Sequence, residues 1–407
     1  MTLTSPRART LAWVVWIVAS LFYAYQYILR VMPSIMLTEI MEQFDFTAAT
    51  FGQFTGIYYI GYSLIHLPIG ILFDRYGPRK TMTGCILLTV IGLLPLLFSN
   101  YWLYPIVGRF LIGVGSSAAI LGVFKVIRMT FSEAHFPRML SLSVTIGLFG
   151  AIYGAGPVSY MQQVFGYQTM IQLFALAGLL LALVTYWIVP SLKTPSEGTV
   201  WANMKEVLTH KKVIASCLFA GLMVGPLEGF ADVWGPLFLK QVYGYDVTLA
   251  ASLSSLIFVG MCFGSPLLSF IADKVGCYLA TIMAAGVIMA LCFILLLAST
   301  FSSNMLSVGF IVIGVCCAYQ ILAIYKVSTF VREGVAGLAA AVANMIIMIF
   351  GYAFHTFIGA VVSEMGGPSA PYALTYGISL IPLALILGSL GFGILKAGEA
   401  SQETISR

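Results

Sequence analysis

Runs of about 18 or more mostly apolar residues recur along this chain, and a helix of that length spans the hydrocarbon core of a bilayer. Hydrophobic residues make up 60% of the sequence and charged residues only 9%, whereas a soluble domain carries about a quarter charged residues. Because backbone polar groups in lipid must be satisfied within the segment, the runs predict helices rather than strands. The twelve expected spans are 11–37, 49–73, 81–99, 102–124, 139–162, 168–190, 213–239, 247–272, 278–299, 304–325, 338–363 and 370–395.

A polar interval divides these runs into two sets of six, and the two sets resemble each other. "LFDRYG" at 72–77 is echoed by "IADKVG" at 271–276, and "VFKV" at 123–126 by "IYKV" at 324–327, with offsets of 199 and 201 residues. Such a repeat predicts an all-α integral membrane protein with two pseudo-symmetric six-helix bundles and a site between them. The expected division is a first bundle over 1–190, a linker over 191–212, a second bundle over 213–396 and a tail over 397–407.

The placement of basic residues predicts the orientation in the membrane. Seventeen of the 20 lysines and arginines lie in the two tails and in the loops on the same side as the tails. Positive charge accumulates on the cytoplasmic side of membrane proteins. We therefore expect a multi-pass protein of the cell inner membrane with both termini and the 191–212 linker in the cytoplasm.

Other chemical classes find little support in the sequence. The seven cysteines lie within or at the edges of apolar runs, and none has metal-ligand spacing with histidine, so we expect neither disulfides nor a metal site. No catalytic triad, haem ligand set or nucleotide-binding loop is present. The chain is therefore expected to be a monomeric non-enzyme without a cofactor, whose basic loops need no nucleic-acid partner.

The segment "GILFDRYGPRK" at 70–80 concentrates charge between two apolar runs. It resembles the signature loop between helices two and three of the major facilitator superfamily, and "RFLIGVG" at 109–115 resembles that superfamily's helix-four motif. The resemblance implies a twelve-helix transporter in which the loop acts as a gating latch. The latch residues would be Gly70, Asp74, Arg75, Gly77, Arg79 and Lys80.

The alternative is that the basic residues of this loop only set topology. The second-half copy of the loop is degraded, because Ser269 replaces the glycine and only Lys274 follows Asp273. An asymmetric latch is therefore expected.

Four ionisable residues lie deep within the expected spans: Arg30, Arg109, Glu228 and Asp232. Charges inside a membrane are costly and usually face partners or water. Arg30 shares a helix face with Tyr23, Tyr27 and Ser34, and Glu228 and Asp232 share a face of helix seven. The expected substrate-binding residues are Arg30, Tyr27, Tyr23, Trp234 and Gln320, and the expected proton-coupling residues are Glu228, Asp232 and Arg109.

Two interpretations of these charges stay open. In one, Arg30 holds a substrate carboxylate while Glu228 or Asp232 takes up a proton, because two neighbouring carboxylates repel each other. In the other, Arg30 and Asp232 form a permanent ion pair or a gate. Arg109 could act in coupling or in helix packing. His66 and His355 could carry protons or could be hydrogen-bonded within helix interfaces.

The sequence thus predicts a secondary transporter that moves an amino acid, short peptide or organic acid by alternating access, with proton symport. "FYAYQYILRVMPSIM" at 22–36 resembles the first helix of the superfamily branch that contains amino-acid and dipeptide carriers. The alternatives are an energy-independent facilitator, a proton-antiport exporter, or a non-transporting membrane sensor or chaperone.

Overall fold

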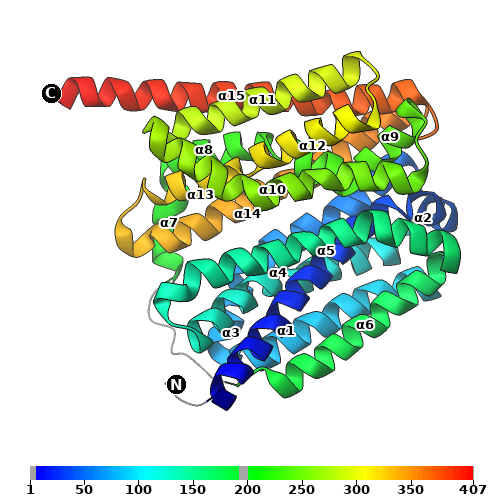
Figure 1. Ribbon diagram of the computed structural model, residues 1–407, viewed down its shortest axis with the longest axis horizontal. Coiled ribbons are helices and arrows are strands. Elements are labelled where there is room, and N and C mark those ends of the chain that lie inside the picture. Colours follow the sequence, from blue (N-terminus) through cyan, green and yellow to red (C-terminus); the bar gives the residue numbers. More distant parts are fainter. Residues whose placement is uncertain (1–5, 192–199, 407) are drawn as a thin grey trace. The chain divides into compact units, whose positions relative to one another are not determined.

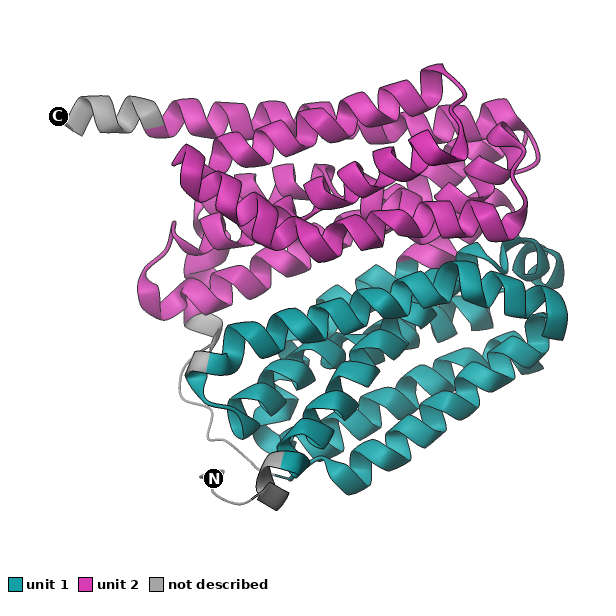
Figure 2. Cartoon of the chain, viewed as in Figure 1, with its two compact units in different colours: residues 1–46, 57–197 teal, residues 47–56, 198–407 magenta. Residues whose placement is uncertain are grey.

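The computed structural model describes residues 6–191 and 200–406, and every regular element in these ranges is a helix (Figure 1). Two compact units make up the chain: unit 1 comprises 1–46 and 57–197, and unit 2 comprises 47–56 and 198–407 (Figure 2). Residues 192–199 of the expected 191–212 linker lie outside the described residues.

Unit 1 is built from long helices that pack side by side. α1 contacts α4, α5 and α6, and Figure 1 shows its ribbon crossing the others at the blue end of the chain. α1 ends just before Pro33, because the residue preceding a proline is disfavoured in helical conformation. The elements are α1 (Pro6–Val31), a 3₁₀ turn (Met32–Ser34), α2 (Leu37–Phe44), the larger part of α3 (Ala48–Phe98), α4 (Leu103–Thr130), a 3₁₀ turn (Glu133–His135), α5 (Phe136–Phe165) and α6 (Tyr167–Ile188).

Unit 2 contains the remaining helices together with the first turns of α3. α10 packs along α12, and α11 packs along α15. Its elements are α7 (Val200–Thr209), α8 (Lys211–Leu222), the π-helix Gly225–Trp234, α9 (Gly235–Tyr243), α10 (Val247–Val275), α11 (Tyr278–Ala298), α12 (Ser303–Cys317), α13 (Tyr319–Ser328), a 3₁₀ turn (Glu333–Val335), α14 (Ala336–Glu364) and α15 (Pro371–Ser406).

Eleven helices of the described chain are long and apolar enough to cross a membrane. One of them, α3, has 51 residues, about 77 Å of helix and more than twice the hydrocarbon thickness. Gly77 interrupts it with φ 77° and ψ 169°, a backbone conformation that glycine adopts without steric cost. α3 therefore supplies two spans, and the expected total of twelve is confirmed.

A close helix contact in unit 1 depends on two glycines. A Cβ on Gly61 of α3 would collide with the carbonyl oxygen of Phe110 in α4, and a Cβ on Gly113 of α4 would collide with the carbonyl oxygen of Tyr58. Small residues at such positions let two backbones approach closely, which is a common way of joining helices in membranes.

Unit 2 contains the same contact. A Cβ on Gly260 of α10 would collide with the carbonyl oxygen of Ile311, and a Cβ on Gly314 of α12 with that of Ile257. The residues of α10 follow their counterparts in α3 by 199 positions, and those of α12 follow those in α4 by 201. These are the offsets found between the sequence motifs, so the internal repeat is confirmed at the level of backbone packing.

We expect Gly61→Ala to destabilise the protein although alanine is the better helix former. Overpacking against a backbone carbonyl costs about 1–3 kcal/mol, which outweighs the gain of about 1 kcal/mol in helix propensity. Thermal unfolding in detergent measures the difference. Gly84→Ala is the matched control, because Gly84 lies on the same helix and nothing lies within 4 Å of a Cβ there. An equal or higher unfolding temperature for Gly61→Ala would contradict the contact.

Candidate functional site

Arg30 lies within a group of tyrosines in unit 1. Its guanidinium carbon is 5.1 Å from the ring centre of Tyr27 on α1 and 5.3 Å from that of Tyr59 on α3. The side chain is 6% exposed. A desolvated guanidinium against aromatic rings gains about 2 kcal/mol from cation–π attraction. The two rings therefore stabilise a charge that would be costly in lipid, while the planar donors of arginine keep the geometry that binds carboxylates.

More tyrosines extend this group on both helices. The rings of Tyr23 and Tyr27 on α1 are 5.2 Å apart in an edge-to-face arrangement. On α3, the Tyr58 ring is stacked 6.2 Å from that of Tyr62, which lies 5.3 Å from the ring of His66. These three residues recur every four positions and so share one helix face. We call Tyr23, Tyr27, Tyr58, Tyr59 and Tyr62 the tyrosine cluster. The sequence predicted only its α1 half, Tyr23 and Tyr27.

Arg109 on α4 holds the end of α1 next to this cluster. Its guanidinium donates to the carbonyl oxygen of Leu29 and, at 2.6 Å, to that of Arg30, and it lies 4.9 Å from the centre of the Tyr58 ring. The last carbonyls of a helix have no intrahelical partner, so Arg109 satisfies two of them in α1. These contacts favour a positioning role for Arg109: it fixes the backbone from which the Arg30 side chain extends.

The two acids of helix seven lie on an irregular part of unit 2. The sequence predicts one continuous helix over 213–239, but the structure has a π-helix from Gly225 to Trp234 between α8 and α9. Pro226 and Pro236 lie near its two ends and lack the N–H that a regular α-helical ladder needs there. π-segments frequently mark functional sites. Glu228 and Asp232 are both buried in this segment, with side chains 1% and 0% exposed.

His355 connects the π-helix to the first turns of α3, which belong to unit 2. Its Nε2 contacts the carbonyl oxygen of Glu228, and its Nδ1 lies 2.9 Å from Oγ1 of Thr55. Close packing surrounds this connection, since a Cβ on Gly52 would collide with the carbonyl oxygen of His355, and one on Gly359 with that of Ala48. The imidazole is therefore a buried link between α14, the π-helix and α3.

The two other expected substrate-binding residues are also buried in unit 2. Trp234 is fully buried, and its ring centre lies 6.0 Å from that of Phe51. Gln320 is 7% exposed and follows Tyr319, whose hydroxyl donates to the carbonyl oxygen of Ala220 at 2.6 Å. Trp234 thus contributes to packing between the π-helix and α3. A direct role of either residue in binding solute stays a prediction.

The structure places the predicted charges in different units, Arg30 and Arg109 in unit 1 and Glu228 and Asp232 in unit 2. Within unit 1 it brings Arg30, Tyr23, Tyr27 and Arg109 together. An ion pair between Arg30 and Asp232 stays a prediction.

Part of the predicted latch forms contacts within unit 1. Oδ1 of Asp74 lies 2.8 Å from Nζ of Lys125 on α4. Nε of Arg79 donates to the carbonyl oxygen of Val189 at 2.7 Å, and the Arg75 guanidinium lies over the ring of Tyr76. The Asp74 pair is partly exposed, so it contributes at most about 1 kcal/mol.

The corresponding residues of unit 2 form different side-chain contacts. Lys326, the repeat counterpart of Lys125, pairs with Glu399 at 2.9 Å. Asp273, the counterpart of Asp74, accepts a hydrogen bond from the hydroxyl of Tyr278. The two loops therefore differ in their side-chain contacts, and an asymmetric latch stays a prediction.

We expect Asp74→Asn to slow transport by up to about fivefold, because a pair worth up to about 1 kcal/mol shifts a conformational equilibrium by that factor. Lys125→Gln should have a similar effect, and the double variant should be no slower than either single variant. Initial rates in proteoliposomes measure this, with Asp273→Asn as the matched control. An equal loss in the Asp273 variant would contradict an asymmetric latch.

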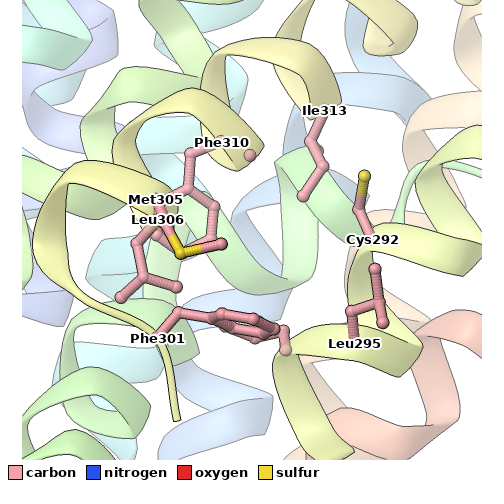
Figure 3. Close-up of a pocket in the computed structure, with 9 residues that line it drawn as sticks. Cys292, Leu295, Phe301, Met305, Leu306, Phe310 and Ile313 are labelled. Carbon is pink, nitrogen blue, oxygen red and sulfur yellow. The ribbon is translucent and has the colours of Figure 1, made fainter. Parts of the chain in front are cut away.

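An apolar hollow in unit 2 has no charged side chain that could bind a polar solute. It lies between α11 and α12, has a volume of about 150 Å³, and is lined by Cys292, Leu295, Leu296, Phe301, Met305, Leu306, Gly309, Phe310 and Ile313. Figure 3 shows that the labelled side chains are hydrocarbon apart from the sulfurs of Cys292 and Met305. No charged group lines it, so the Arg30 and Glu228 regions remain the candidate sites.

A profile of the Major Facilitator Superfamily matches residues 15–355. The chain belongs to the Major Facilitator Superfamily. Among solved structures, that of a bacterial homologue of the human lysosomal transporter Spinster covers 96% of each chain with a TM-score of 0.72 at 16% identity, which shows the shared fold. The match to this transporter superfamily confirms the expected family, fold and non-enzymatic class.

Curated relatives of this superfamily member match only part of its length. The uncharacterized transporter YybO of Bacillus subtilis is 27% identical over 263 residues, which cover 57% of this chain and 59% of YybO. A quinolone resistance transporter of Acinetobacter baumannii is 25% identical over 246 residues, covering 52% of this chain and 55% of the relative. The chain thus spans between a half and three-fifths of the length of each of these two relatives.

Sequence reasoning missed the α3 tyrosines and the partners of His355. The signal for the first was "YYIGYSLIH" at 58–66, in which Tyr58, Tyr62 and His66 recur every four residues. The second had no such signal, because Thr55 and His355 are 300 positions apart. Only the packing of α14 against α3 brings these two side chains together.

Proposed function

We propose that this superfamily member is a secondary active transporter that imports a small carboxylate-bearing solute together with protons. The solute would be an amino acid, a short peptide or an organic acid, carried by alternating access. Both termini and the linker would lie in the cytoplasm of a cell whose inner membrane holds the protein, as the distribution of lysine and arginine indicates.

The observation that carries the proposal is the arginine enclosed by tyrosines within a membrane span. Arg30 is 6% exposed, with rings at 5.1 and 5.3 Å. An intramembrane charge is a functional-site candidate, and a guanidinium in an apolar setting binds a carboxylate through two parallel charge-assisted hydrogen bonds. The neighbouring tyrosines supply hydroxyls and ring faces for the rest of a small solute.

The buried acids of unit 2 support the choice of protons as the coupling ion. Glu228 and Asp232 lie four residues apart in the π-helix and are almost fully buried. Two carboxylates at this spacing repel each other when both are charged. We propose that they take up the proton that accompanies the solute, with Arg109 holding α1 in place.

A second candidate is export of a drug-like compound in exchange for protons. The name of the Acinetobacter baumannii relative favours it, because that protein is a quinolone resistance transporter. Export would use the same intramembrane charges and reverse the relation between the solute flux and the proton flux. Facilitated diffusion without coupling is the remaining alternative.

Uptake by proteoliposomes distinguishes these functions. Pools of radiolabelled amino acids, dipeptides, organic acids and sugars are offered to reconstituted protein, with the outside either acidic or at the same pH as the inside. Symport predicts accumulation of one carboxylate-bearing pool above its outside concentration only with the acidic outside. Equal entry under both conditions, without accumulation, would show facilitated diffusion. Accumulation in a third condition, with the outside made alkaline, would show antiport.

A further inference from the structure

The hydrogen bonds of His355 determine where its protons are. The Glu228 carbonyl oxygen can only accept, so Nε2 of His355 carries a hydrogen. Nδ1 faces Oγ1 of Thr55 at 2.9 Å, and a hydroxyl can donate or accept. The backbone carbonyl thus fixes the hydrogen on Nε2. Whether Nδ1 accepts or donates a hydrogen depends on the orientation of the Thr55 hydroxyl.

Thr55 has alternative acceptors for its single hydrogen. Its Oγ1 lies 3.0 Å from the carbonyl oxygen of Phe51 and 3.1 Å from that of Gly52. With neutral His355, the hydroxyl donates to Nδ1. With protonated His355, Nδ1 donates to Oγ1, and the hydroxyl hydrogen turns to a carbonyl of its own helix. Both protonation states are therefore fully hydrogen-bonded, and addition of a proton to Nδ1 requires only that one hydroxyl rotates.

Few ionisable groups lie at the same depth along the helices as His355. Residues 47–56 carry none. The π-helix carries Glu228 and Asp232, α8 carries Cys217, α13 carries Tyr319, and α14 itself carries Tyr352. Among the side chains that the structure describes, the remaining ionisable groups on α14 and on elements packed against it lie toward helix ends: Lys205, Glu206, Lys211, Lys212, Tyr325, Lys326, Glu333, Glu364, Tyr372, Tyr376, Lys396 and Glu399.

We propose that His355 is a proton-binding residue of the transport cycle, holding its proton on Nδ1 against Thr55. Burial makes an imidazolium costly unless both N–H groups are bonded and a negative charge is near. Both bonds exist here, and the acceptor for Nε2 is the backbone carbonyl of Glu228, in the same π-helix that carries the Glu228 and Asp232 carboxyl groups. The inference rests on the proposed proton coupling and adds a third proton-binding group to the two acids.

Because of the position of His355, binding of a proton there changes a hydrogen bond between helices. The imidazole joins α14 to the π-helix and to the first turns of α3. The backbones pack closely around it, because a Cβ on Gly52 or Gly359 would collide with a carbonyl oxygen of the facing helix. Taking up a proton reverses the hydrogen bond to Thr55. The bond that changes lies at the first turns of α3, while the bond from Nε2 keeps its direction and joins a charged imidazolium to the π-helix that carries Glu228 and Asp232.

Nuclear magnetic resonance of histidine-labelled protein in lipid nanodiscs tests the proton site without any solute. The chain has four histidines, and His355→Gln identifies the signal to follow. We expect Nε2 to stay protonated while Nδ1 gains its hydrogen as the pH falls. Thr55→Val removes the acceptor for Nδ1–H and should move the midpoint about one unit to lower pH. Thr55→Ser keeps the hydroxyl and should leave it in place. A signal that does not titrate, or an unshifted midpoint in Thr55→Val, would overturn the proposal.

Transport assays then separate this inference from the proposed function. Glutamine can replace both hydrogen bonds of neutral histidine but cannot take up the proton. His355→Gln is therefore expected to retain exchange of labelled amino acids and organic acids across the liposome membrane and to lose accumulation driven by an acidic outside. Full accumulation in His355→Gln would overturn the role of His355. Absence of proton-driven accumulation in the unmodified protein would instead overturn the proposed function.

Discussion

Replacing Arg30 with alanine is expected to weaken solute binding about 10- to 100-fold. A charge-assisted hydrogen-bonded contact to a buried carboxylate is worth about 1.5–3 kcal/mol, and about 1.4 kcal/mol corresponds to a factor of ten in affinity. Arg30→Lys should lose about tenfold, because lysine keeps the charge but neither the two parallel donors nor the flat contact with Tyr27 and Tyr59. Calorimetry with the solute pool that the uptake assay identifies measures both affinities.

A matched variant shows whether the loss is specific to the site. Arg138 is exposed on α5, so Arg138→Lys should bind solute as the unmodified protein does. Thermal unfolding without solute checks that Arg30→Lys is folded. If Arg30→Ala keeps full affinity but changes the rate of solute exchange, Arg30 acts as a gate rather than as a binding residue.

Neutralising the buried acids is expected to abolish proton-driven accumulation while leaving exchange intact. Glu228→Gln and Asp232→Asn each remove one carboxyl group that we propose to bind the proton, and the amide that replaces it has nearly the same shape. We expect accumulation to fall at least tenfold in one of the two variants, because a carrier that cannot bind the proton cannot couple the two fluxes. Paired assays of exchange and of accumulation on the same liposomes measure the difference.

An exposed acid of the same unit provides the control. Glu364 lies at the end of α14 and is exposed, so Glu364→Gln should accumulate solute normally. Parallel loss of exchange and accumulation in both acid variants would indicate a structural role for the pair. Unchanged accumulation in both would remove them from the coupling mechanism.

The apolar runs predicted the architecture well, because the bilayer constrains length and composition so strongly. Twelve spans followed from the runs, and the offsets of 199 and 201 residues reappear in the paired glycines Gly61 with Gly113 and Gly260 with Gly314. The charges also identified Arg30 and the Glu228 region as places of interest, since an ionisable residue within a span is conspicuous in any sequence.

The contacts of those charges were beyond sequence reasoning. A periodic pattern places residues on one helix face but does not name the helix opposite, so the Tyr59 ring beside Arg30 and the Leu29 carbonyl beside Arg109 could not be foreseen. The π-helix was missed for a related reason. Prolines and glycines at 225–236 indicate an interruption, but the hydrogen-bond register that replaces the α-helical one depends on packing around it.

The most direct test of proton-coupled import uses liposomes that contain a trapped pH dye and have their membrane potential clamped at zero. The carboxylate-bearing pool is added outside, with no pH gradient at the start. Symport predicts acidification of the interior that begins with solute addition and is absent with Arg30→Ala. Alkalinisation of the interior, or uptake of labelled solute with no change in pH, would contradict the account.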